Sequence, residues 1–220
     1  MRPDPAAELA RARLVVYRTL ATCFLEPTAE RLATLRTAVP ELRLRAAPVA
    51  ELVPGRAWET LLRALEGVRE REAEAAAGEH ATLFLAGARG RACPPCASAY
   101  LVRTGYEVAD VIAAVESAYR AAGVAVDGEL LPDHVSVELD FLGELCRREA
   151  EDAPRGASRW REAQVSFLRR HVLPWLPRFV RRLVSSSPRG FYRWPAEAAL
   201  ALARHDEALL GSLGAGRGVA

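Results

Sequence analysis

Residues 130–146, with the sequence LLPDHVSVELDFLGELC, carry the strongest fold signal in the chain. A proline, an acid and an imidazole stand at positions 132–134, directly before an apolar helical pattern. Two apolar stripes follow, one of Val135, Leu139, Leu142 and Cys146 and the other of Val137, Phe141 and Leu145. A helix that is apolar on two faces belongs in the middle of a fold. We therefore expect residues 133–150 to form a central, buried helix.

Helical periodicity extends over almost all of the remaining chain, and the alternation typical of strands is almost absent. Helices are predicted at about 9–24, 28–40, 56–87 with an interruption at Gly78, 108–122, 158–184 and 195–210. Residues 41–55 are predicted to form a loop. Gly123 is suited to a left-handed helix cap, and the prolines at 174 and 177 predict a kink or a split near Trp175. The pattern predicts an all-α fold, a compact bundle of about eight to ten helices.

The predicted helices form a single domain over residues 1–212. Its two loosely defined subdomains, about 1–122 and 133–212, are joined by a hinge near 123–132, where the sequence GVAVDGELLP separates two helical patterns. The glycine-rich end, 213–220, is expected to be a disordered tail.

Composition excludes several classes of protein. Of the 220 residues 50% are hydrophobic and 26% charged, as in soluble globular proteins, and the net charge of +2 is too small to indicate binding to nucleic acid or an anionic membrane. No apolar run is long enough for membrane insertion, and the acidic, arginine-bearing start does not resemble a secretion signal. Four cysteines do not make a disulfide scaffold in a chain of this length. We expect a cytoplasmic protein.

The sequence Cys93-Pro94-Pro95-Cys96 is the most tempting chemical motif. A CxxC pair can ligate zinc or exchange thiols, but a structural zinc site needs two further ligands and the redox motif needs a βαβ setting. Neither is evident, so a proline-stiffened loop with incidental thiols is the favoured interpretation. We expect no metal and no cofactor.

The histidines give no sign of a catalytic site. His80, His134, His171 and His205 fall on four different predicted elements, and no phosphate-binding loop, nucleophile elbow or HExxH pair is present. We therefore expect a protein that is not an enzyme.

Four motifs together point to a family. They are HATLFLAG at 80–87, CPPCASAY at 93–100, PDHVSVELDFLGELCRREA at 132–150 and FLRRHVLPWLPRF at 167–179. In order and spacing they resemble the TorD-like family of redox-enzyme maturation chaperones, with its DmsD and NarJ branches. The positions that agree are Leu83, Phe84, Pro94, Pro95, Ser98, Tyr100, Pro132, Asp133, His134, Glu138, Leu139, Phe141, Phe167, Leu168, His171, Trp175, Pro177 and Phe179. The chain departs from the family pattern at His80, at Cys96-Ala97 and in the displaced acid Glu129.

The resemblance implies a non-enzymatic, all-helical chaperone of the cytoplasm. Such chaperones bind the apoprotein of a molybdopterin-containing oxidoreductase of the dimethyl-sulfoxide-reductase type. Many also hold its twin-arginine signal peptide until the cofactor is inserted. The implied partners are therefore the apo-form of a molybdenum oxidoreductase catalytic subunit and its leader peptide, and the chain itself is expected to be a monomer or a homodimer.

The expected client-binding or peptide-binding residues are Glu129, Pro132, Asp133, His134, Glu138 and Phe141. Arginine–carboxylate pairs are directional and often bidentate, so a receptor for a twin-arginine peptide needs carboxylates beside an apolar surface. The alternative is that Asp133 only caps the following helix while His134 packs at its first turn. Two other functions stay open, a helical interaction module unrelated to redox enzymes and a small enzyme that uses Asp133 and His134.

Overall fold

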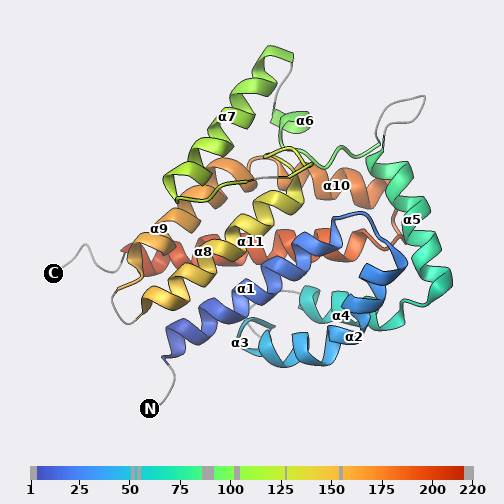
Figure 1. Ribbon diagram of the computed structural model, residues 1–220, viewed down its shortest axis with the longest axis horizontal. Helices are drawn as coiled ribbons and strands as arrows, with labels where there is room; N and C mark the ends of the chain where they lie inside the picture. The colour runs from blue at the N-terminus through green and yellow to red at the C-terminus, as the bar shows by residue number, and fades with distance from the viewer. Residues whose placement is uncertain are drawn as a thin grey trace.

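The computed structural model describes residues 4–50, 53, 56–85, 92–101, 105–126, 128–153 and 156–215. Over these residues the fold is all-α, as predicted, and contains no strand (Figure 1). The α-helices are α1 (Pro5–Cys23), α2 (Ala29–Arg45), α3 (Ala47–Ala50), α4 (Ala57–Gly67), α5 (Glu70–Phe84), α6 (Ser98–Leu101), α7 (Gly105–Ala121), α8 (Val135–Asp152), α9 (Ser158–Phe167), α10 (Leu176–Ser186) and α11 (Arg193–Ala215). A five-residue π-helical segment, η3 (Leu168–Val172), follows α9 directly. The α-helices longer than four residues number nine in this part of the chain, within the predicted range.

Helix α8 is the central helix that the sequence predicts. It runs beside α1 through the middle of the molecule and packs against α9 as well (Figure 1). Gly143 lets α1 approach closely, because a Cβ atom there would lie 3.2 Å from Cγ of Arg18. The Ser136 hydroxyl donates a hydrogen bond of 2.9 Å to the Ala21 carbonyl and so joins the two helices at one end.

One hydrophobic core serves both predicted subdomains. Helices α1 and α8 pack against each other, and α4 packs against α11, so each pair joins an early helix to a late one. Phe24 from the end of α1 lies 5.9 Å from Phe179 of α10, centroid to centroid. Whether residues 123–132 act as a hinge between two subdomains stays a prediction.

Local signals explain several helix boundaries. The Thr28 side chain caps α2 by accepting a hydrogen bond of 3.1 Å from the Arg31 N–H. After α7, Gly123 takes a positive φ of 66°, the left-handed conformation expected of a helix cap. The chain divides into η3 and α10 on either side of Trp175, where the prolines predict a break.

The loop predicted over residues 41–55 and two predicted helix limits are wrong. Residues 41–45 belong to α2 and residues 47–50 form α3. Helix α2 continues through Pro40 to Arg45, because buried Val39 and core-packed Leu42 hold both sides of the proline in place. The break in 56–87 comes between α4 and α5, where the Glu72 carboxylate accepts from the Arg69 N–H at 3.0 Å; Gly78 lies inside α5.

Helix α11 is also longer than expected. It includes residues 213–215, which the sequence assigns to a disordered tail. Residues 216–220 lie outside the described part of the chain.

Candidate functional site

Three of the four sequence motifs meet at the N-terminal end of α8. The 93–100 motif lies against residues 133–135: the Val135 N–H donates to the Pro95 carbonyl (2.8 Å) and the Ala97 N–H to the Asp133 carbonyl (2.9 Å). From the fourth motif, the Trp175 ring stacks on Tyr100 at a centroid distance of 5.7 Å. We call Pro95, Ser98, Asp133, Glu138 and Trp175 the motif junction.

Asp133 holds the preceding loop rather than its own helix. Its side chain is fully buried, and one carboxylate oxygen accepts a hydrogen bond of 2.8 Å from the Ser98 N–H at the start of α6. The cap of α8 is instead His134, whose Nδ1 accepts from the Ser136 N–H at 3.1 Å. The alternative in which Asp133 caps the helix is therefore wrong, because its carboxylate faces the Ser98 N–H at the start of α6.

Glu138 is a buried acid one turn further along α8. One of its oxygens accepts a hydrogen bond of 3.0 Å from the indole N–H of Trp175, which is itself fully buried. Burial raises the pKa of the Glu138 carboxyl well above its ordinary value; the Trp175 hydrogen bond opposes that shift, and the nearby Asp133 charge adds to it. The surroundings of Glu138 thus favour its neutral form.

The raised pKa of Glu138 predicts a pH-dependent stability. The group binds its proton more tightly in the folded state, so its stabilising contribution is complete below the unfolded pKa of about 4.3 and is lost as the pH rises through the folded pKa. Glu138→Gln keeps an acceptor for Trp175 and does not titrate. In urea unfolding at pH 4, 6 and 8, we expect the variant to gain stability over the wild type as the pH rises. An identical difference at all three pH values would contradict a raised pKa.

Beside the motif junction lies an open groove of about 520 Å³, which we call the linker groove. Its walls come from α1 and the residues just after it, from residues 124–126 and 128–130, and from α8. The lining residues are Arg18, Ala21, Thr22, Leu25, Val124, Ala125, Val126, Gly128, Glu129, Leu130, Ser136, Val137, Asp140, Phe141 and Glu144. Three are carboxylates and one is an arginine, so the groove is acidic as well as apolar. Val126 and Leu130 are each 37% exposed, and Leu131 next to them is 48% exposed.

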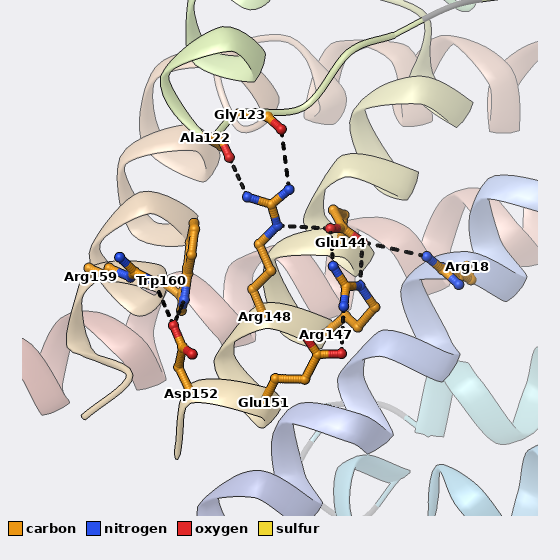
Figure 2. A network of polar contacts seen from close by, with 10 residues as sticks. All are labelled: Arg18, Ala122, Gly123, Glu144, Arg147, Arg148, Glu151, Asp152, Arg159 and Trp160. Atoms are coloured by element: carbon orange, nitrogen blue, oxygen red, sulfur yellow. Dashed lines mark hydrogen bonds and ion pairs between the residues drawn. The ribbon is translucent and has the colours of Figure 1, made fainter. Parts of the chain in front are cut away.

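Polar contacts hold both ends of the linker, by which we mean the segment between α7 and α8. At its start, the Arg148 guanidinium reaches from α8 to the carbonyls of Ala122 and Gly123 (Figure 2). Its positive charge also interacts favourably with the C-terminal end of the α7 dipole. At its end, the Tyr119 hydroxyl donates to the Pro132 carbonyl at 2.7 Å. The linker groove therefore has a defined shape.

Glu144 is the centre of the network in Figure 2. It accepts hydrogen bonds from Arg147 at 2.6 Å and from Arg148 at 2.8 Å, and Arg18 lies 3.7 Å away. The hydrogen bonds from Arg147 and then Arg148 lower the pKa of Glu144 to about 2, against the opposing effect of burial. This carboxylate is already neutralised within the chain, so Asp140 and Glu129 are the carboxylates of the groove that remain for a ligand.

The six predicted client-binding residues divide into two groups. Glu129 is exposed, Pro132 is half-buried, and both border the linker. Asp133, His134, Glu138 and Phe141 are buried, although Phe141 lines the floor of the linker groove. Direct contact between the client and these side chains stays a prediction.

A second buried polar network lies outside the residues predicted from the sequence. Arg13, 1% exposed, donates to Asp206 at 2.8 Å and to Glu149 at 2.9 Å, and it also donates to Gln164. The network joins α1, α8, α9 and α11. A signal was available, since Arg13 stands four residues from both Leu9 and Tyr17 and therefore interrupts the apolar stripe of its helix.

The cysteines of the 93–100 motif are buried and not bridged. The Cys93 thiol lies 3.6 Å from the Ser186 hydroxyl, and burial raises its pKa. Within the described ranges no three His, Cys, Asp or Glu side chains gather in a way that could hold a metal ion. The helices in the described residues are also too short or too polar to cross a membrane.

Comparison with known proteins places this geometry in context. Over 62 residues the chain is 44% identical to a selenate reductase assembly chaperone protein from Thauera selenatis; the match spans 27% of this chain and 32% of the relative. The crystal structure of an Archaeoglobus fulgidus protein, provisionally assigned as a redox enzyme maturation protein, has the same fold. Its TM-score is 0.52 at 21% identity, over 90% of this chain and 93% of that one.

A family model described as the nitrate reductase delta subunit matches residues 53–181, more than half of the chain. The matched region contains all four sequence motifs, the motif junction and most of the linker groove. The resemblance to redox-enzyme maturation chaperones is thereby confirmed, and the chain belongs to the nitrate reductase delta subunit family.

Proposed function

We propose that the protein is a cytoplasmic chaperone for the assembly of a molybdopterin-containing oxidoreductase of the dimethyl-sulfoxide-reductase type. It binds the cofactor-free catalytic subunit, its twin-arginine leader peptide, or both, until the cofactor is inserted, and it is not itself an enzyme. Membership of the family supports this function, as does the assembly role in the name of the Thauera selenatis relative. The observation that carries it is the linker groove, which combines exposed apolar side chains with the carboxylates of Glu129 and of Asp140, the latter only loosely paired with Arg18.

The chemistry of the linker groove suits a basic and apolar segment. No cation in the described part of the chain pairs with Glu129, and Asp140 has only a distant contact of 3.7 Å with Arg18. Guanidinium groups bind carboxylates with directional, often bidentate hydrogen bonds. Leu130 and Val126 lie beside these acids, and a peptide that places arginines before an apolar stretch meets both kinds of surface.

The motif junction has a positioning role in this proposal. Asp133 fixes α6 and the loop before it, and His134 caps α8, so together they set where the linker enters the helix. Loss of these contacts displaces the walls of the linker groove. It does not remove a side chain that contacts the client.

We expect the double variant Glu129→Gln/Asp140→Asn to bind the client about tenfold more weakly, which corresponds to about 1.4 kcal/mol. Binding by the wild type should also weaken as salt is added, because exposed charges are screened over about 8 Å at physiological ionic strength. The measurement is titration calorimetry against the catalytic subunit and, separately, against its leader peptide.

The matched control is Glu116→Gln on α7, which removes a half-buried carboxylate outside the linker groove. It should bind like the wild type. Equal affinities for the double variant and the control would place the binding site elsewhere. A wild type that binds neither the subunit nor the leader would argue for an interaction module unrelated to redox enzymes.

A further inference from the structure

A second groove, of about 670 Å³, lies between α7 and the α9–η3 segment, and we call it the α7–α9 groove. Its lining residues are Ala114, Ser117, Ala118, Ala121, Ala122, Phe141, Arg159, Trp160, Ala163, Ser166, Phe167, Arg170 and His171. The α7 wall consists of alanine and serine, and the α9–η3 wall contributes Ala163 and Ser166 among larger side chains. The floor contains Phe141 and Phe167, whose ring centroids lie 4.7 Å apart. Small side chains on both walls leave room for the backbone of another helix, which needs axial distances of about 8–10 Å.

The charge of the α7–α9 groove is opposite to that of the linker groove. Its lining contains two arginines and no carboxylate. Arg159 is partly neutralised by Asp152, at 2.7 Å, and it stacks on the Trp160 ring. Arg170 has a hydrogen-bond partner in the Ser166 hydroxyl, at 3.0 Å from its Nε, and no carboxylate partner among the described residues. Arg170 therefore offers an unneutralised guanidinium at the rim of an apolar groove.

His171 contributes an apolar ring surface to this rim and little positive charge. Burial and then the nearby Arg170 lower its pKa below the ordinary value, which favours the neutral imidazole at neutral pH. Its ring lies 5.0 Å from that of Phe167 and extends the apolar floor. The cationic character of the groove thus depends on the arginines.

Helix α7 leaves this groove open. Within residues 107–121, Val115 and Tyr119 are the buried side chains, while Ala113, Ala114, Ser117 and Ala121 are exposed. Helix α7 therefore carries more apolar side chains than its contact with the core buries. Surfaces of this kind, apolar and rimmed by charge, are typical of protein interaction sites.

We propose that the α7–α9 groove binds an amphipathic helix of the client's apoprotein that carries carboxylates beside its apolar face. This inference rests on the proposed function and names a second contact for it. Charge complementarity selects the occupant, since an acidic helix meets Arg170 here while a basic segment is attracted to the linker groove. Phe141 lines both grooves, so the two sites are neighbours on either side of one side chain. The two grooves therefore offer adjoining surfaces, one for the leader and one for an acidic helix of the apoprotein.

The first test fills the groove. Ala114→Trp places an indole in the α7–α9 groove, whereas Ala113→Trp places one on the same exposed helix outside the lining. Against the full cofactor-free subunit, we expect Ala114→Trp to lower the affinity at least tenfold and Ala113→Trp to leave it unchanged. Both variants should bind the isolated leader peptide like the wild type.

The second test reverses the charge. Arg170→Glu should weaken binding of the cofactor-free subunit about tenfold and Arg170→Lys should restore most of it, while Arg181→Glu, at an exposed position on α10, should have no effect. Full affinity in both Ala114→Trp and Arg170→Glu would overturn the assignment of this groove. So would a leader affinity that falls in parallel with that of the subunit, because the leader would then occupy it. Failure of the wild type to bind the subunit at all would instead overturn the proposed function.

Discussion

Arg13→Leu is expected to destabilise the protein by about 3–5 kcal/mol, the usual cost of removing one partner from a buried ion pair. The side chains of Arg13 and Asp206 are 2% and 0% exposed, and that of Glu149 is 6% exposed. Without the guanidinium, Asp206 loses its cation in a setting that water does not reach, and Gln164 loses a donor. Guanidinium chloride unfolding followed by circular dichroism measures the change.

Two further variants make this result specific. Arg11→Leu changes an exposed arginine on the same helix and should shift the unfolding free energy by no more than about 0.5 kcal/mol. Adding Asp206→Asn to Arg13→Leu removes the stranded charge and should recover part of the lost stability. If Arg13→Leu lowered the free energy of unfolding no more than Arg11→Leu does, the network would be exposed to water and not buried.

Leu139→Ala is expected to cost about 2–5 kcal/mol, as for other buried leucines whose surroundings do not collapse into the vacated space. Leu139 is 1% exposed and lies on the central helix, which is packed by other helices and has little freedom to close the cavity. Asp140→Ala, at the neighbouring exposed position, is the matched control and should change the free energy of unfolding by about 0.5 kcal/mol or less. An effect of Leu139→Ala as small as that of the control would make α8 a peripheral helix.

The sequence predicts the fold well where periodicity is strong. The two apolar stripes of residues 135–146 place α8 in the centre. Gly123 and the prolines beside Trp175 mark real breaks, because the backbone conformations that glycine and proline allow do not depend on the remaining chain. The limits of α2 and α5 are harder to predict. Tertiary packing around Val39 outweighs the cost of Pro40, and the break after α4 depends on the capping contact between Glu72 and Arg69.

For the candidate site, the sequence identifies the right segment and leaves the direction of its side chains open. Asp133 lies beside a predicted hinge, yet its carboxylate accepts a hydrogen bond from the N–H of Ser98, which stands 35 positions earlier in the chain. Such a contact depends on tertiary structure and has no local signature. The sequence does not distinguish Asp140, because an exposed acid on a helix is usually no more than a solvated charge. Its place in the linker groove depends on the assembly of α1, α8 and residues 124–126 and 128–130.

The most direct test of the proposed chaperone role compares two forms of one client. The catalytic subunit of a molybdopterin oxidoreductase from the same genome is titrated into the chaperone by calorimetry, once free of cofactor and once loaded with it. A chaperone that holds its client until cofactor insertion should bind the cofactor-free subunit and bind the loaded subunit at least tenfold more weakly. Equal affinity for the two forms, or no binding of the cofactor-free form, would contradict this role.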